Sequence, residues 1–214
     1  MFGLQRNTQF DRKYSDYDYS ADARGLDDYW PREVRAVLDE LKIGELEGYS
    51  VIDVGAGNGI EDELLLADHP RLTVVDLGQK SIAAALKRIP KANHLVMDAE
   101  DLQAISTASF DIYLSFRTYQ SSYFDIHDAI REAHRVTRPG GVVVVSVANG
   151  FIGEDGVLVP GLVWPNTARV DRDRPFAVAD SIRRRLTLLG FQEVGIRTGL
   201  GEIYVYGRRQ VQLS

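Results

Sequence analysis

The sequence predicts a doubly wound α/β fold with a mostly parallel sheet and an antiparallel last strand. Two observations support this prediction. Short apolar runs alternate with segments of helical periodicity between residues 49 and 148, and the last two apolar runs are joined by the short connection TGLG. Alternating strands and helices need crossover connections, which make neighbouring strands parallel, whereas a short connection favours an antiparallel pair.

The predicted elements follow in chain order. The strands are Tyr49–Val54, Leu72–Asp76, His94–Met97, Phe110–Phe116, a fifth within PGGVVVVSVA (residues 139–148), Phe191–Arg197 and Glu202–Arg208. The four consecutive valines of the fifth strand indicate burial on both faces. The helices are Ile60–Ala67, Ser81–Arg88, Asp125–Thr137, Phe176–Leu189 and a first helix that begins at Pro31 and stops at Gly44.

Periodicity also predicts the domain organisation. Residues 1–30 are polar and tyrosine-rich without a clear period, so we expect an N-terminal arm that acts as a lid. Residues 31–214 form one predicted domain. Within it, residues 149–175 carry several Gly and Pro residues and show no sustained period, which predicts a long insertion without regular structure.

Composition excludes several classes of function. The formal charge of −6 argues against nucleic acid as the main ligand, and the absence of cysteine excludes disulfides and thiolate sites. No leader-like N-terminus or membrane-length apolar run is visible, so we expect a cytoplasmic protein without a membrane partner. A homodimer stays open.

The segment VIDVGAGNGIED, residues 51–62, places Gly55, Gly57 and Gly59 where the first strand ends and a helix begins. Glycine costs roughly 0.5–1 kcal/mol relative to alanine in such elements. A tight turn with positive φ accounts for one or two of these glycines. All three together predict a backbone that a ligand approaches closely, at the sheet edge where open parallel sheets bind ligands.

The glycine spacing separates the possible nucleotide-like ligands. G-x-G-x-G differs from the G-x-G-x-x-G of dinucleotide sites, and no lysine followed by Ser or Thr completes a phosphate-binding loop. Asp53, just before the glycines, would repel a phosphate but suits a ligand with an amino or sulfonium group.

Asp53, Asp76 and Asp98 each stand at the end of one of three neighbouring predicted strands. Asp76 follows the glycines by about 20 residues, the spacing of an acid that binds a ribose diol. A single aspartate after a strand is often a turn or cap residue, and this alternative stays open for each. Three at one edge favour a ligand site.

The ordered segments VIDVGAGNG, VVDLGQKSI, MDAEDL, FDIYLSF and EAHRVTRPGGVVVVS resemble the class I S-adenosylmethionine-dependent methyltransferases. The resemblance covers about Tyr49–Val147, and the later segments LTLLGFQEV and EIYVYGRR fit the family's last helix and strand pair. It implies a Rossmann-like, seven-stranded sheet, S-adenosyl-L-methionine as cofactor, and methyl transfer as the activity.

The resemblance also implies roles at the methionine end of the cofactor. Asp53 would lie near its amino group, as would the carbonyl of Ser115. The loop passing beneath the methionine part would consist of Gly55, Ala56, Gly57 and Gly59.

At the adenosine end, the resemblance implies that Asp76 binds the ribose hydroxyls and that Leu77 packs beside the adenine. Asp98 would accept a hydrogen bond from the adenine amine, and the amide of Ala99 would face the ring.

The segment LSFRTYQSS after the fourth strand lacks the acids of metal-dependent relatives, so we expect no metal. Arg117 and Tyr119 are the candidate catalytic residues, which would orient an anionic or phenolic acceptor. The alternative, that both only cover the cofactor's edge, stays open.

Aromatic residues of the arm and the insertion are candidate substrate-binding residues, because they suit a lid over a sulfonium or a small apolar substrate. They are Tyr19, Tyr29 and Trp164, and Tyr123 joins them from the segment after the fourth strand. The predicted acceptor is an O or N atom of a small molecule. Methylation of a protein, peptide or tRNA and a non-catalytic cofactor-binding scaffold are the alternatives.

Overall fold

The computed structural model describes residues 26–119, 125–152, 158–160, 162–163 and 170–211. Its main sheet has seven strands in the order β10-β11-β5-β4-β1-β2-β3. The strands are β1 (Val51–Val54), β2 (Leu72–Asp76), β3 (Asn93–Val96), β4 (Phe110–Ser115), β5 (Thr137–Ala148), β10 (Phe191–Thr198) and β11 (Glu202–Arg209).

The strand directions confirm the predicted doubly wound topology. Strands β1 to β5 pair in parallel, and β11 runs antiparallel to both β5 and β10. The chain starts at the centre with β1, winds outward to β3, and then returns to β4 on the other side of β1. The carboxyl ends of β1, β2 and β4 therefore meet at one edge, where the glycine loop lies.

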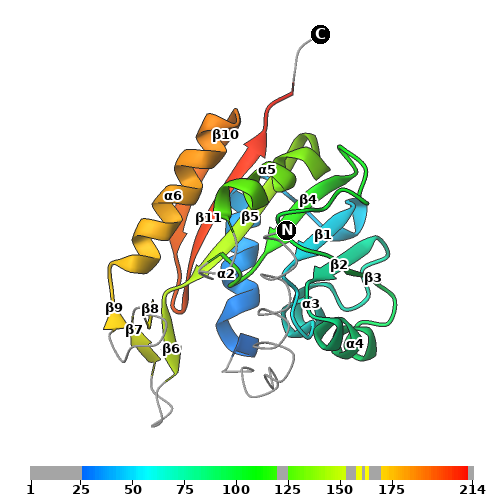
Figure 1. Ribbon diagram of the computed structural model, residues 1–214, viewed down its shortest axis with the longest axis horizontal. Coiled ribbons are helices and arrows are strands. Elements are labelled where there is room, and N and C mark those ends of the chain that lie inside the picture. Colours follow the sequence, from blue (N-terminus) through cyan, green and yellow to red (C-terminus); the bar gives the residue numbers. More distant parts are fainter. Residues whose placement is uncertain (1–25, 120–124, 153–157, 161, 164–169, 212–214) are drawn as a thin grey trace, which may run out of the picture.

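Helices cover both faces of the sheet (Figure 1). Helices α2 (Leu26–Glu40), α3 (Ile60–Leu66) and α4 (Gln79–Arg88) bury their apolar residues against one face. Helices α5 (Ile126–Val136) and α6 (Arg174–Leu188) cover the other. The buried valines of β5 alternate between the two cores, as the sequence predicts for a strand covered on both sides.

The first helix begins earlier than predicted. Helix α2 starts at Leu26, and Pro31 lies inside it rather than in its first turn. The proline removes one backbone donor, but tertiary packing compensates, because Trp30 is fully buried and packs edge-to-face on Phe116 with ring centroids 4.7 Å apart. The predicted boundary at residue 30 therefore falls within a helix.

Side chains of α2 bind the last strand pair. Glu33 accepts hydrogen bonds from the Tyr204 hydroxyl at 3.0 Å and from the Leu200 amide at 2.8 Å. Glu40 accepts hydrogen bonds from Arg197 and from the Tyr206 hydroxyl. These contacts fix α2 over β11, beside the end of β5.

The predicted insertion contains regular structure, contrary to expectation. Strands β6 (Gly150–Ile152) and β7 (Leu158–Pro160) form one antiparallel pair, and β8 (Leu162–Val163) and β9 (Val170–Asp171) form another. Strands this short carry too few residues to show a period in the sequence, which explains why the pattern was missed.

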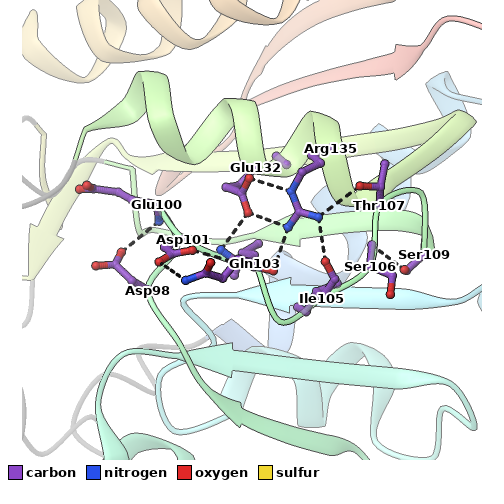
Figure 2. Close-up of polar contacts among 12 residues, drawn as sticks. Asp98, Glu100, Asp101, Gln103, Ile105, Ser106, Thr107, Ser109, Glu132 and Arg135 are labelled. Atoms are coloured by element: carbon purple, nitrogen blue, oxygen red, sulfur yellow. Dashed lines mark hydrogen bonds and ion pairs between the residues drawn. The ribbon is translucent and has the colours of Figure 1, made fainter.

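The connection between β3 and β4 is bound to α5 (Figure 2). The Arg135 guanidinium donates to the carbonyls of Leu102 and Ile105, each at 2.8 Å, while Glu132 accepts the Leu102 amide at 2.8 Å. Glu132 also holds Arg135 in place with a 2.7 Å ion pair. This network positions the loop that carries Asp98 and Ala99.

We expect Arg135→Gln to lower the free energy of unfolding by about 1–3 kcal/mol, because two loop carbonyls lose a charged donor. Arg131→Gln is the matched control, since Arg131 pairs with Asp128 on the exposed side of the same helix at 3.3 Å. It should cost less than about 0.5 kcal/mol. Urea unfolding of both variants measures the difference, and equal losses would contradict the role given to Arg135.

Candidate functional site

The glycine loop between β1 and α3 uses left-handed backbone at all three glycines. The φ angles are +84° at Gly55, +55° at Gly57 and +76° at Gly59. A side chain at any of these positions would be strained. Backbone conformation therefore accounts for all three, more than the one or two expected from the sequence.

The three positions differ in what lies next to them. A Cβ at Gly55 would overlap the Thr118 side chain, and one at Gly59 would lie 3.1 Å from the Cβ of Ala85. A Cβ at Gly57 would meet no described atom within 4 Å. The backbone at Gly57 is therefore the part of the loop that a ligand can approach.

Asp76, at the end of β2, binds the glycine loop directly. Its carboxylate accepts the Gly57 amide at 2.9 Å and the Gly78 amide at 2.7 Å. Burial raises the pKa of Asp76, while these two amides oppose that shift. Asp76, which is predicted to bind a ribose, thus also joins the loop after β1 to the loop after β2.

Asp53 forms a buried carboxyl pair with Asp62 of α3. Asp53 is 1% exposed and Asp62 is 2% exposed, and their side chains share a hydrogen bond. Burial raises the pKa of Asp53 to about 7 and also raises that of Asp62. The Glu61 and Asp76 carboxylates push the Asp53 pKa in the same direction.

This pair was only half predicted from the sequence. Asp53 was a candidate through its place before the glycines, whereas Asp62 lies in the first turn of a helix, where an acid is ordinary. One oxygen of each carboxyl, Oδ1 of Asp53 and Oδ2 of Asp62, is buried without a hydrogen-bond partner among the described residues. Unpartnered buried oxygens of this kind are suited to a cationic ligand group.

The other predicted cofactor residues lie along the same edge. Asp98 is half-buried and accepts the Glu100 amide at 3.0 Å. One of its oxygens therefore has the turn role that the sequence analysis considered as an alternative to ligand binding. Leu77 and Ala99 are also half-buried, and Ala56 is buried in the core. Their roles toward a cofactor stay predictions.

Ser115 ends β4 and is fully buried, with its hydroxyl donating to the carbonyl of Val54. Arg117 follows with a left-handed φ of 54°. Its amide donates to the Ser146 hydroxyl at 2.9 Å, and its guanidinium lies 4.0 Å from Glu202. Arg117 therefore joins β4, β5 and the start of β11.

Tyr119 lies in the apolar core under α5 and is fully buried. Its hydroxyl is 3.2 Å from that of Tyr113 on β4, and burial raises the pKa of both phenols. The structure thus gives Tyr119 a packing role, and its predicted role toward an acceptor has no geometric support among the described residues.

Glu202 was missed by the sequence prediction. It opens β11 opposite Ala148, the last residue of β5, and is 1% exposed. Burial raises the pKa of its carboxyl to about 7, although Arg117 and the Ser146 hydroxyl oppose the shift. In the sequence, Glu202 follows Gly201 at the start of an alternating strand, and nothing in this pattern predicts that the acid is buried.

Three of the predicted substrate-binding residues, Tyr19, Tyr123 and Trp164, lie outside the described residues. Tyr29 belongs to α2, but its side chain is likewise not described. Their contacts stay predictions.

Within the described ranges, no group of three His, Cys, Asp or Glu side chains is arranged to hold a metal ion. The described helices include none with the length and apolar character needed to cross a membrane.

Residues 52–145 match a family model described as a methyltransferase domain. These residues run from β1 to β5 and include Asp53, the glycine loop, Asp76 and Asp98. These comparisons support a class I S-adenosylmethionine-dependent methyltransferase domain over this segment, which is less than half of the chain. They also support S-adenosyl-L-methionine as its cofactor.

Two bacterial methyltransferases are among the curated relatives of this chain. It is 29% identical over 137 residues to a ubiquinone biosynthesis O-methyltransferase of Pseudomonas syringae pv. tomato, covering 62% of this chain and 57% of the relative. It is 26% identical over 130 residues to a dTDP-4-amino-2,3,4,6-tetradeoxy-D-glucose N,N-dimethyltransferase of Saccharopolyspora spinosa, covering 60% and 51%. The chain thus spans about half the length of the curated relatives it matches.

A solved structure matches nearly the whole methyltransferase fold. The N-methyltransferase NodS of Bradyrhizobium japonicum, in complex with S-adenosyl-L-homocysteine, superposes with a TM-score of 0.61 at 18% identity. The match covers 95% of this chain and 98% of NodS. At this identity the likeness shows the fold alone.

The residues present fit the cofactor. S-adenosyl-L-methionine carries an ammonium and a sulfonium. The unpartnered Oδ1 of Asp53 is a buried acceptor on the strand that leads into the glycine loop, in which Gly57 has open space among the described residues. Asp76 and Asp98 each have carboxylate lone pairs beyond those that accept the loop amides. This edge is acidic, as a cationic ligand requires.

We expect the Asp53–Asp62 pair to make the free protein less stable as pH rises. The folded pKa of both carboxyls is raised, that of Asp53 to about 7, so the folded state binds more protons than the unfolded state above about pH 4. Stability therefore falls as pH rises from about 4 through 7. Asp62→Asn removes one titrating group and should flatten the fall by about 1–3 kcal/mol.

Urea unfolding from about pH 5 to pH 8 measures this effect. Asp68→Asn is the control, because Asp68 is exposed and pairs with Lys91 on the surface. Glu202 also has a raised pKa, so a residual fall should remain in the Asp62 variant. Parallel curves for wild type and Asp62→Asn would contradict the shared burial of the pair.

Proposed function

We propose that this chain transfers a methyl group from S-adenosyl-L-methionine to an oxygen or nitrogen atom of a small-molecule acceptor. The observation that carries the proposal is the edge formed by Asp53, Gly57 and Asp76 within the matched methyltransferase segment. Relatives named as O-methyltransferase and N,N-dimethyltransferase support both acceptor atoms.

The bound cofactor would supply an activated methyl: the acceptor's lone pair forms a bond to the methyl carbon while the carbon–sulfur bond breaks and its electron pair stays on sulfur. Asp53 would hold the cofactor's ammonium, together with the carbonyl of Ser115. Asp76 would bind the ribose hydroxyls, and Asp98 the adenine amine. What the protein adds is mainly orientation, which is worth about 7–11 kcal/mol in well-aligned reactions.

Further features of the proposal concern the surroundings of the reaction. Arg117 is proposed to lie on the acceptor side of the site, since it follows β4 and contacts the start of β11. The reaction is proposed to need no metal, and the protein is proposed to act in the cytoplasm.

We expect calorimetry to detect binding of S-adenosyl-L-homocysteine, with NAD and ATP giving no signal. Asp76→Asn should weaken this binding roughly 5- to 150-fold, equivalent to about 1–3 kcal/mol, because one carboxylate oxygen becomes a donor facing an amide or a ribose hydroxyl.

Asp68→Asn is the matched control, because that carboxylate lies on the surface. It should leave the affinity unchanged. Binding of NAD with higher affinity than S-adenosyl-L-homocysteine would overturn the proposed function. An unchanged affinity in Asp76→Asn would remove the ribose role alone.

Methyl transfer should persist in EDTA, because the segment after β4 lacks a carboxylate cluster in the sequence LSFRTYQSS. The measurement is the initial rate of label transfer from methyl-labelled cofactor with and without chelator. A complete loss that magnesium restores would show that a metal ion takes part.

A further inference from the structure

Glu202 is a buried acid that the cofactor roles above do not use. It is 1% exposed, and neither carboxyl oxygen has a hydrogen-bond partner among the described residues. The Arg117 guanidinium lies 4.0 Å away, beyond hydrogen-bonding distance. A buried carboxyl with open acceptor sites needs an explanation, because leaving such a group unsatisfied costs about 1–3 kcal/mol or more.

The position of Glu202 along the sheet places it beyond the cofactor. Across the sheet, the strand order runs β3, β2, β1, β4, β5 and β11. Asp98 follows β3, Asp76 ends β2, and Asp53 lies near the end of β1. Glu202 opens β11, three strands from β1, and strands lie about 4.8 Å apart. It therefore lies roughly 14 Å from the β1 line, on the side where the methyl group would meet an acceptor.

The charges that face Glu202 come from several elements. Arg117, after β4, is the cation, and the acids are Glu61 of α3 and Glu33 of α2. The Ser146 hydroxyl of β5 accepts the Arg117 amide, which leaves its own proton available for Glu202. Acids outnumber the single cation among these groups, so the surroundings favour a positively charged acceptor over an anion.

We propose, building on the methyl transfer proposed above, that Glu202 binds an amine acceptor and takes a proton from its ammonium nitrogen. The N–H bond breaks, the proton moves to a Glu202 carboxyl oxygen, and the nitrogen keeps the electron pair. That pair then forms the bond to the methyl carbon, and the carbon–sulfur pair stays on sulfur.

The protonation behaviour of Glu202 suits this role. Burial raises the pKa of the carboxyl to about 7, so it can both release and accept a proton near neutral pH. A nearby sulfonium and the low-dielectric surroundings would lower the pKa of the ammonium. The pKa values of the ammonium and of the Glu202 carboxyl would then differ less, which eases proton transfer between them. Arg117 favours the ionised form of Glu202, because its positive charge lowers the pKa of the carboxyl.

The test uses cofactor with a ¹³C-labelled methyl group and a bacterial small-molecule extract separated into cationic, neutral and anionic fractions. Methyl groups on nitrogen and on oxygen differ in carbon chemical shift, so NMR identifies the acceptor atom. We expect label on nitrogen in the cationic fraction. Glu202→Gln should lower the rate at least about tenfold, which corresponds to about 1.4 kcal/mol.

Two measurements make the result specific. Affinity for S-adenosyl-L-homocysteine should stay within about threefold in Glu202→Gln, because the acid lies beyond the cofactor. Glu63→Gln is the matched control, since Glu63 pairs with Arg88 on the surface at 2.8 Å. It should leave both affinity and rate unchanged.

A pH profile keeps the proposal testable if Glu202→Gln fails to fold. The wild-type rate should fall below about pH 7 as Glu202 becomes protonated. Ser146→Ala removes a hydroxyl that lowers the Glu202 pKa, so this acid limb should move to higher pH. An acid limb that is absent, or that Ser146→Ala leaves in place, would overturn the proposal.

The outcomes separate the amine acceptor from methyl transfer itself. Label on oxygen, label in the anionic fraction, or an undiminished rate in Glu202→Gln overturns the role of Glu202 and leaves methyl transfer intact. A loss of S-adenosyl-L-homocysteine affinity in Glu202→Gln would assign the acid to the cofactor instead. A wild-type protein that binds no S-adenosyl-L-homocysteine, or transfers no label, contradicts the proposed function.

Discussion

The two hydrogen bonds that Asp76 accepts from Gly57 and Gly78 are the contact on which the arrangement of the site depends. They join the loop after β1 to the loop after β2. The backbone at Gly57, which has open space beside it, therefore lies at a fixed distance from the Asp76 carboxylate. Two further amides, those of Gly55 and Ala56, donate to the carbonyl of Val75 at 2.7 and 3.0 Å. The loop is therefore held on β2 before any ligand arrives, and a preformed loop loses less entropy on binding.

Much of this arrangement could be predicted from the sequence because it follows from periodicity and from strand ends. The mostly parallel sheet and the antiparallel β11 follow from alternating elements and from a short connection, which are local patterns. Asp76 and Asp98 could be placed at one edge because parallel strands bring their carboxyl ends together. The limit of such reasoning is visible at Pro31, where packing of Trp30 on Phe116 overrides a local helix-start signal.

The residues that sequence reasoning missed or misplaced depend on contacts between distant segments. Glu202 is buried because α2 lies over β11, and nothing in its own neighbourhood indicates that cover. Asp62 is buried against Asp53 from a helix turn where acids are usually exposed. Tyr119 was expected at the mouth of the site because it follows β4, yet its ring enters the core beside Tyr113, and no period reveals such a reversal in a loop.

The buried acids of this protein have opposite effects on stability and on binding. Asp53, Asp62 and Glu202 lie in low-dielectric surroundings that raise their pKa values, so ionising them near neutral pH lowers the stability of the free protein. A cationic ligand that binds only the folded state recovers that free energy, since it pairs with carboxylates that water cannot reach. The methionine ammonium would do so at Asp53, and an amine acceptor would do so at Glu202. The same burial that weakens the free protein would therefore favour cations in both halves of the site, and affinity for them should rise as pH increases through 7 while the stability of the free protein falls.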